Sequence, residues 1–477
     1  MQLNNAKKQL LGGTTVYFIG NTLAQIASLL LLRFVTGEIS SDEYGYYNLI
    51  VTIGNLLTPI LTLQMSDALF RYFIKAEGEE QKRAYYTNAT AVFLVGSVLV
   101  FASICCINSF YPLRYPWLVA LYIVSTNLYM LYQKMLRAMG KSVMFAALGL
   151  IKTVLYIASQ MILLFVFGMG GKALFVSTLF TTFLAIFAIE LIAKPHRYFR
   201  LKSLNRGVLK KMLIFSLPLV PNTALWWLSS SINSVIVTAR LGLNVNGIYT
   251  VANKFSTIVT SVSTVFMMAW QESAIKEYKT ANFKKFQTET FNSYFILMLS
   301  AIAALIPLAK LAIPYLIDPS YYAAVVYVPF LLLSTMFSSF SSYCAQIMTA
   351  QEKTKNIMST TIFGAVSNLV IVAVLVNFIG LWAAVIGTLV SHLTLTVVRL
   401  FFVRSEFTRD ISYLRISLLF VAIAVGSVLY LYADTVTLAA YFVLMAVLAF
   451  LFNREFIFSV LRLIFSKLKR KKAPKAN

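Results

Sequence analysis

The sequence predicts an all-α, polytopic membrane protein, and three observations lead to this fold class. Hydrophobic residues make up 59% of the 477 positions, and the mean hydropathy of +0.77 lies far above that of soluble domains. Apolar stretches of roughly 20 residues, the length that crosses about 30 Å of hydrocarbon, recur along the whole chain. The longest segment between them, residues 194–211, is too short to bury a hydrophobic core. We therefore expect no soluble domain.

The apolar stretches form two series of six and a final pair, about 14 transmembrane helices in all. The first series is expected near residues 12–33, 45–66, 87–108, 115–136, 143–167 and 172–193. The second is expected near residues 212–239, 246–270, 289–312, 323–348, 357–379 and 381–403, and the final pair near 414–432 and 436–453. Each series would form one six-helix lobe. The predicted divisions are 1–206 for the N-terminal lobe and linker, 207–403 for the C-terminal lobe, and 404–477 for the last two helices and a basic tail.

The distribution of basic residues predicts the topology. A net charge of +24 would indicate nucleic-acid binding in a soluble protein, but here lysines and arginines gather in alternate loops, as membrane insertion requires. With a cytoplasmic N-terminus, most of the 41 Lys and Arg residues fall in cytoplasmic segments, and both termini are cytoplasmic. We expect membrane lipids, and no nucleic acid, as partners. Seven basic residues break the pattern: Arg33, Arg114, Lys152, Lys172, Arg240, Lys254 and Lys310.

The helix expected near 212–239 carries a polar stripe inside an apolar stretch. Asn222, Trp226, Asn233 and Arg240 recur along it at helical spacing. Lipid offers no hydrogen-bond partner to amides or a guanidinium group, so this face should contact protein or a water-filled cavity. These residues are therefore candidate substrate contacts.

The first helix has a matching stripe, and the match predicts an internal repeat. Asn21 and Gln25 lie on it as further candidate contacts, and the helix ends near Arg33. A glycine–tyrosine corner follows in each half, Gly45-Tyr46-Tyr47 and Gly247-Ile248-Tyr249. The second half begins six spans after the first. Because six is an even number, both halves have the same orientation in the membrane, and the repeat axis runs along the membrane normal.

Four of the basic residues that break the charge pattern are candidate substrate contacts. Lys152 falls near the middle of its helix, where an unpartnered lysine costs on the order of 3 kcal/mol. Lys254, Arg240 and Arg33 lie nearer the external boundary. A cavity that holds an anionic substrate would explain all four. Snorkelling side chains or interfacial anchors are the alternative explanation.

Acidic residues within the spans are few. Asp67 and Glu190 lie near the cytoplasmic ends of their helices. If transport is coupled to a proton or sodium gradient, Asp67 is the first candidate for the coupling site. A local ion pair with Arg71, one turn further on, is the alternative. Several cations and few acids in a cavity favour a phosphate or pyrophosphate group as the bound species.

Other chemical motifs are weak or absent. His196 and His392 lie far apart in the sequence, so we expect no metal site, and no motif indicates a cofactor or a catalytic centre. We therefore expect a protein that is not an enzyme.

Trp226 and Trp227 would either stack on sugar rings or belong to the aromatic belt at the membrane interface.

Short motifs along the chain match a known family. They are the basic N-terminus, the loop SSDEYGYY at residues 40–47, ALFRY at 68–72, SLPLVP at 216–221 and the corner at 241–249. Together they resemble the polysaccharide transporters, or Wzx-type flippases, of the multidrug/oligosaccharidyl-lipid/polysaccharide exporter superfamily, over essentially the whole chain. One departure is Asn233-Ser234, which stands where such proteins often have an acidic–basic pair.

The resemblance implies a two-lobed, V-shaped transporter whose central cavity opens alternately to each side. Its substrate would be a polyprenyl-pyrophosphate-linked oligosaccharide, moved from the inner to the outer leaflet of a bacterial cytoplasmic membrane. The product would feed assembly of a capsule, an exopolysaccharide or an O-antigen-like glycan, alongside a polysaccharide polymerase and other assembly proteins.

Three alternatives stay open at this point. The two additional helices resemble the fourteen-helix members of the superfamily, which include lipid II flippases. A multidrug exporter of the same superfamily would be expected to carry acids deep in its cavity, where this chain has lysines. A membrane glycosyltransferase or polymerase would need catalytic acids such as Glu38, Asp42 or Glu43, but the expected external loops are too short to hold an acceptor.

Overall fold

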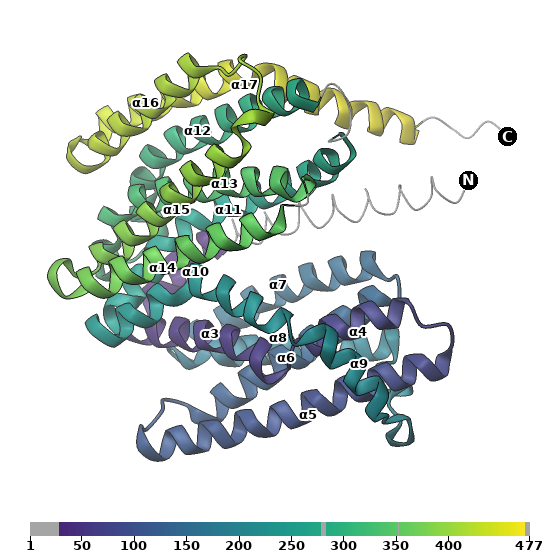
Figure 1. Ribbon diagram of the computed structural model, residues 1–477. Helices are drawn as coiled ribbons and strands as arrows, with labels where there is room; N and C mark the ends of the chain where they lie inside the picture. The colour runs from purple at the N-terminus through teal and green to yellow at the C-terminus, as the bar shows by residue number, and fades with distance from the viewer. Residues whose placement is uncertain (1–27, 278–282, 352, 473–477) are drawn as a thin grey trace. The chain divides into compact units, whose positions relative to one another are not determined.

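We describe a computed structural model of the chain over residues 28–277, 283–351 and 353–472. All regular secondary structure in these ranges is helical (Figure 1). Ten helices of the described residues are long and apolar enough to cross a membrane, or up to eleven if one bent pair counts as a single span. The predicted all-α membrane fold is thus confirmed. The number of fourteen spans and the cytoplasmic termini stay predictions, and most of the first expected span lies outside the described residues.

The described helices follow the expected spans closely. In the first half they are α2 (Leu32–Glu38), α3 (Ser41–Leu61), α4 (Met65–Ile74), α5 (Glu79–Phe110), α6 (Pro116–Ala138), α7 (Ser142–Phe165), α8 (Lys172–Ala193), α9 (Arg206–Ser216) and α10 (Leu219–Leu241). In the second half they are α11 (Leu243–Glu277), α12 (Phe283–Leu316), α13 (Val328–Ala350), α14 (Thr354–Ile379), α15 (Trp382–Val403), α16 (Tyr413–Tyr432) and α17 (Thr435–Lys472). Short 3-10 helices join some of them: η1 (Pro195–Tyr198), η2 (Leu201–Ser203), η3 (Pro319–Tyr327) and η4 (Arg404–Glu406).

The helices form two compact units. The first unit takes the described residues up to Val251, together with Leu316–Tyr322 and Leu369–Ala384. The second takes Ala252–Tyr315, Ala323–Asn368 and the described residues from Val385 onward. The lobes predicted from the repeat, with divisions after residues 206 and 403, stay a prediction.

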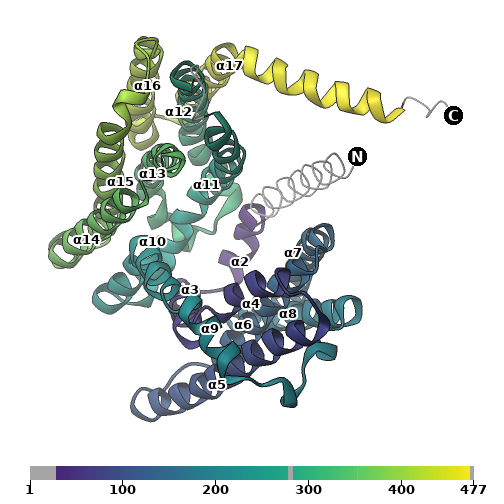
Figure 2. The same ribbon diagram turned by 45° about the vertical axis from the view of Figure 1, so that its right-hand side comes forward.

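Two apolar clusters hold the first unit together, one toward each end of α5 and α6. At one end, Met65 of α4, Met135 of α6 and Met212 of α9 are fully buried in the same cluster. At the other end, Ile123 of α6 and Phe175 of α8 pack with residues of α3 and α5. The helices α4, α5, α6 and α8 accordingly pack side by side (Figures 1 and 2). Burial of this kind fixes the helix faces that remain for lipid or for a functional site.

The span expected at 45–66 is bent. Helices α3 and α4 meet at an angle of 55°, because Leu63 and Gln64 adopt left-handed backbone conformations with φ of 49° and 52°. Such a conformation costs a non-glycine residue roughly 1 kcal/mol or more. The Gln64 amide donates to Thr223 Oγ1 of α10 at 2.6 Å. This hydrogen bond links the break to a second helix and helps to hold it.

The two glycine–tyrosine corners contact each other. A Cβ on Gly45 would lie 1.9 Å from the carbonyl oxygen of Leu243, and a Cβ on Gly247 would lie 1.9 Å from that of Ser41. The contacts are reciprocal, since residue 41 stands to residue 45 as residue 243 stands to residue 247. A two-fold repeat axis would produce this exchange. The reciprocal contact at the α3–α11 crossing fits two related halves, and the parallel orientation of the repeat stays a prediction.

Candidate functional site

The polar stripe of α10 is partly used for packing within the first unit. Asn233 is only 4% exposed, and its amide donates to the Ala384 carbonyl at 3.3 Å and the Tyr249 hydroxyl at 3.5 Å. The Ser234 hydroxyl donates to Asn48 Oδ1 of α3 at 2.9 Å. Hydrogen bonds between membrane helices of this kind satisfy groups that lipid cannot. Asn233 thus joins α10 to α11 and to the first turn of α15.

The remaining amide and aromatic candidates cannot be placed in the same way. Asn21 and Gln25 lie outside the described residues. Asn222 and Trp226 lie in the first turns of α10, and their side chains are not among those described. The neighbouring Trp227 donates from Nε1 to the Thr52 carbonyl of α3 at 2.7 Å. This indole therefore contributes to the packing of α10 against α3.

Arg33 lies in the first turn of α2 and is held by two partners. Its Nη1 donates to the Ile317 carbonyl at 2.5 Å and lies 3.6 Å from a carboxylate oxygen of Asp318. The backbone N–H and hydroxyl of Ser320, together with Arg33, lower the pKa of that carboxylate. Arg33 keeps 39% of its side chain exposed. The contacts fit the anchor that the sequence offered as an alternative, while the exposed part leaves room for a ligand.

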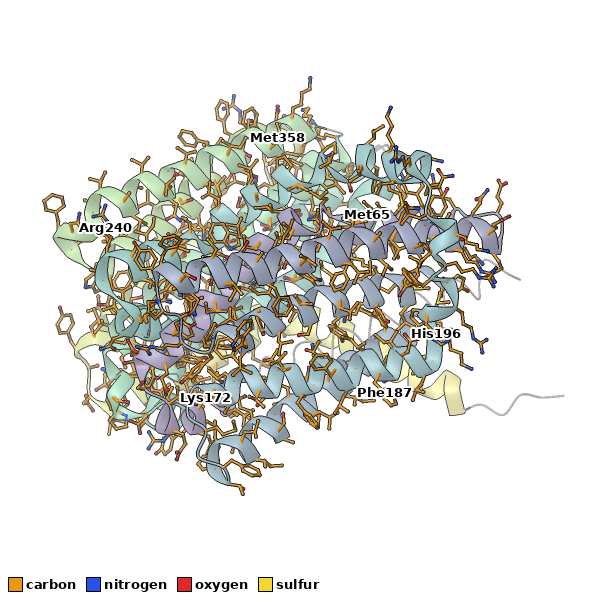
Figure 3. The ribbon with its side chains drawn as sticks, turned by 90° about the horizontal axis from the view of Figure 1, so that it is seen from below. Met65, Lys172, Phe187, His196, Arg240 and Met358 are labelled. Atoms are coloured by element: carbon orange, nitrogen blue, oxygen red, sulfur yellow. The ribbon has the colours of Figure 1, made fainter. Side chains whose placement is uncertain are left out.

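Arg240 differs from Arg33 in having no such partners. It is exposed at the end of α10, and within the described part of the chain no hydrogen bond or ion pair involves it. Figure 3 shows it on the same side of the molecule as Lys172, which opens α8. Lys172 places its ammonium 5.1 Å from the centre of the Tyr115 ring. Two of the basic residues that break the charge pattern therefore lie at the end of the first unit where the topology predicts the external side.

Lys152 lies within α7 and is half-buried. Its ammonium stands 3.9 Å from the centre of the Tyr129 ring of α6. No carboxylate among the described residues pairs with it. A cation over a ring face gains about 0.5–2 kcal/mol, more when water is excluded. The aromatic face offsets part of the cost of placing Lys152 in the span, and the positive charge stays available to an anion.

Asp67 has a different partner from the one expected. Its carboxylate receives a hydrogen bond from the Lys134 ammonium of α6 at 2.5 Å. Arg71 instead places its guanidinium 4.4 Å from the centre of the Phe215 ring of α9. The expected Asp67–Arg71 pair is therefore wrong, because α4 packs against α6 and α9 and their side chains take both groups. Lys134 and Asp67 are each about one-third exposed, which leaves this pair open to solvent.

In the second unit, Arg399 is a buried cation that the sequence reasoning missed. It is 7% exposed, and it donates to the hydroxyls of Ser341 at 2.9 Å, Thr360 at 3.1 Å and Thr361 at 2.7 Å. The carbonyl of Ser341 accepts a further bond at 3.3 Å. The guanidinium thus ties α15 to α13 and α14. An arginine inside an apolar span, opposite hydroxyl residues on other spans, was the available signal.

Lys254 lies in the second unit and is half-buried on α11, where its carbonyl accepts a hydrogen bond from the Thr257 hydroxyl. Lys310 of α12 donates to the Ala433 carbonyl at 3.3 Å and stands 5.7 Å from the Tyr430 ring centre.

Over the described residues, no group of three or more His, Cys, Asp or Glu side chains could hold a metal ion.

Comparisons with solved structures identify the fold first. The lipid II flippase MurJ, in an inward closed conformation, has a TM-score of 0.69 at 15% identity and matches 94% of this chain and 100% of its own. An inward-facing multidrug resistance MATE family transporter of the MOP superfamily has a TM-score of 0.65 at 17% identity, covering 85% of this chain and 95% of its own. A MOP superfamily transporter from Pyrococcus furiosus has a TM-score of 0.55 at 16% identity, covering 87% and 96%. At these identities the likeness establishes the fold.

The family follows from the sequence profiles. The profile described as polysaccharide biosynthesis protein matches residues 10–271, more than half of the chain, and the MatE profile matches residues 218–374. Among curated protein sequences, no significant match is found. The chain belongs to the polysaccharide biosynthesis protein family, and it is a multi-pass membrane protein with the fold of the MATE and MurJ structures. The expected family resemblance is confirmed.

Proposed function

We propose that this protein flips polyprenyl-pyrophosphate-linked oligosaccharides from the inner to the outer leaflet of a bacterial cytoplasmic membrane. The observation that carries the proposal is the joint assignment of a transporter fold and the polysaccharide biosynthesis family. A transporter that serves polysaccharide synthesis must move a membrane-borne precursor, because a glycan cannot cross hydrocarbon unaided. The glycan would then be assembled outside as a capsule, an exopolysaccharide or an O-antigen-like polymer, with a polymerase as a functional partner.

The charges within the spans support an anionic head group. Lys152 carries a positive charge within α7 and has an aromatic ring, rather than a carboxylate, beside it. A diphosphate would meet this cation without first displacing a salt-bridge partner. Arg240, Arg33 and Lys254 extend the set of cations, and Asn21, Gln25, Asn222, Trp226 and Asn233 remain the proposed sugar contacts. Rocking of two lobes about a midplane site would provide alternating access.

Coupling to a proton or sodium gradient is assigned to Asp67 in this proposal. The Asp67 carboxylate is paired with the Lys134 ammonium at 2.5 Å. Binding of a proton or a sodium ion by Asp67 would therefore release Lys134. Such a pair offers two arrangements that a transport cycle can alternate between.

The test is translocation of a fluorescent polyprenyl-pyrophosphate oligosaccharide in proteoliposomes that contain equal amounts of each variant. We expect Lys152→Ala to reduce the initial rate by roughly ten- to a hundredfold, since one charge-assisted contact contributes roughly 1.5–3 kcal/mol. Arg240→Ala should also reduce it. Lys310→Ala is the matched control, because this lysine also lies near a tyrosine ring but is bonded to the Ala433 carbonyl.

The outcomes separate the candidate functions. Normal flipping by both Lys152→Ala and Arg240→Ala would retain the flippase and remove the site assignment. The MurJ-like fold makes lipid II a specific second candidate, so the same assay is run with lipid II. Flipping of lipid II alone would replace the oligosaccharide substrate. Transport of cationic dyes, with neither lipid moved, would favour a multidrug exporter.

A further inference from the structure

A basic groove lies where the linker between the two halves enters α9. It has a volume of about 540 Å³ and is lined by Tyr72, Gly207, Lys210, Lys211, Ile214 and Phe215. All of these residues belong to the first unit. None of them takes part in the proposed transport site.

Aromatic rings and cations are interleaved around the groove. The Lys211 ammonium stands 5.2 Å from the centre of the Tyr72 ring, and Tyr72 stacks on Tyr85 with ring centres 5.4 Å apart. Arg71 lies over Phe215 at the rim. Across the described residues no carboxylate is paired with Lys210, Lys211 or Arg71, and the groove lining contains no acidic residue. Lys211 and Arg71 are therefore held in position by aromatic rings, and none of the three charges is neutralised by a carboxylate of the described residues.

The inner face of α9 packs against α4 and α5, and the groove lies beside this contact, between Tyr72 of α4 and the exposed lysines of α9. Asn205 caps the helix by accepting from the N–H groups of Gly207 and Val208. Met212 is fully buried against α4 and α5. The orientation of the exposed lysines therefore follows from the capping and packing of α9.

The depth of the groove in the membrane indicates which ligand it would bind. Residues Arg206–Leu225 form a candidate membrane span, so Lys210 and Lys211 lie one to two turns from its end. Exposed apolar side chains occur on both sides of them, with Ile214 at 65% and Leu201 at 74% exposure. An amphipathic basic segment with this pattern lies in the interface, where lipid phosphates are located.

We propose that this groove binds the phosphate head group of an anionic phospholipid of the cytoplasmic leaflet. The lysines and Arg71 contact the phosphate, and the rings with Ile214 pack against the glycerol backbone and the first acyl carbons. Anionic charge complements the three unneutralised cations, whereas a zwitterionic head group would bring its own ammonium against them. This inference does not depend on the identity of the transported substrate.

Lipid retention measured by native mass spectrometry on the delipidated full chain in detergent tests the proposal. We expect the wild type to retain phosphatidylglycerol in preference to phosphatidylcholine. Lys210→Gln combined with Lys211→Gln should weaken retention about tenfold or more, because each basic residue near an anionic head group adds to the attraction. The matched control combines Lys353→Gln with Lys355→Gln, which removes two exposed lysines at the start of α14, another segment expected on the cytoplasmic side.

Three results would overturn the proposal. They are equal retention by the groove variant and the wild type, equal retention of the two lipids by the wild type, and an equal loss in the control variant. Inorganic phosphate and glycerol phosphate are added in separate arms at the lipid concentration. Displacement of phosphatidylglycerol by either would assign the groove to a soluble anion instead of a lipid. Because all four lysines are exposed, circular dichroism and gel filtration should show folded protein for every variant.

Discussion

At the scale of single residues, two cations inside the spans are accommodated in different ways. Lys152 has the face of Tyr129 beside it, whereas Arg399 has hydroxyl and carbonyl oxygens from two other helices. The first environment leaves the charge available to an anion. The second satisfies several donors and leaves Arg399 only 7% exposed. We infer a binding role for Lys152 and a structural role for Arg399.

The structural role of Arg399 predicts a loss of stability on truncation. Arg399→Ala removes hydrogen bonds to α13 and α14 and leaves a cavity, so we expect a cost of about 2–4 kcal/mol. Arg399→Lys should recover only part of this, since one ammonium cannot reproduce the planar, forked geometry of the guanidinium. Thermal unfolding of the purified protein in detergent, followed by intrinsic fluorescence, measures both variants.

Arg404→Ala is the control for this prediction. Arg404 is exposed just beyond the end of α15, and its guanidinium lies 4.1 Å from the centre of the Phe401 ring. Its loss should change the Tm little, since such exposed contacts contribute up to about 1 kcal/mol. If Arg399→Ala and Arg404→Ala have the same Tm, the hydrogen bonds to Arg399 do not stabilise the second unit.

At the scale of helices, the crossing of α3 and α11 depends on two glycines. The backbones approach so closely that a single methyl group at either position would overlap a carbonyl oxygen. The Asn246 amide donates to the Gly45 carbonyl at 3.0 Å across the same crossing. Small residues permit this approach, as they do at many contacts between membrane helices.

Gly45→Ala and Gly247→Ala should therefore separate the two helix ends. We expect each to destabilise the protein by roughly 1–3 kcal/mol or more, the range found for overpacked sites. Gly54→Ala is the matched control within α3, because its Cβ would meet Ile123 at 3.6 Å, an ordinary contact. Thermal unfolding and hydrogen exchange of the α3 backbone amides would report the change. An unaltered Tm in Gly45→Ala would show that the helices separate at no cost.

At the scale of the whole molecule, the distribution of basic residues predicts how the chain is oriented in the membrane. Figure 3 shows Lys172 and His196 at opposite ends of α8, with Phe187 exposed along the helix between them. The basic linker 194–211 follows the end marked by His196. The positive-inside rule places that end in the cytoplasm and Lys172 outside.

Cysteine labelling tests this orientation in intact cells. In a background where Cys105, Cys106 and Cys344 are replaced by alanine, Lys172→Cys should react with a membrane-impermeant maleimide added outside. Lys202→Cys should react only after the membrane is permeabilised. Both lysines are exposed, so the side of the membrane is the main difference between them. The reverse pattern would invert the topology and place the proposed lipid groove in the outer leaflet.

The sequence by itself determined the membrane fold, the approximate helix positions and the family. Length and apolarity of a span are local properties, set by the thickness of the bilayer. The glycine–tyrosine corners are also a local feature of the sequence, and their repetition indicated two related halves. Lys152 could be selected as a candidate substrate contact for a similar reason, because its depth in the membrane follows from its position along one helix.

The tertiary structure alone decided which groups meet. Asp67 pairs with Lys134 and not with Arg71 because α6 packs against α4, and no spacing within α4 indicates this. The break at Gln64 depends on Thr223, far away in the sequence. Arg399 is buried because hydroxyls on two other helices surround it. Partners of charged and polar groups depend on helix packing, which a single span does not encode, since its apolar surface faces lipid and protein alike.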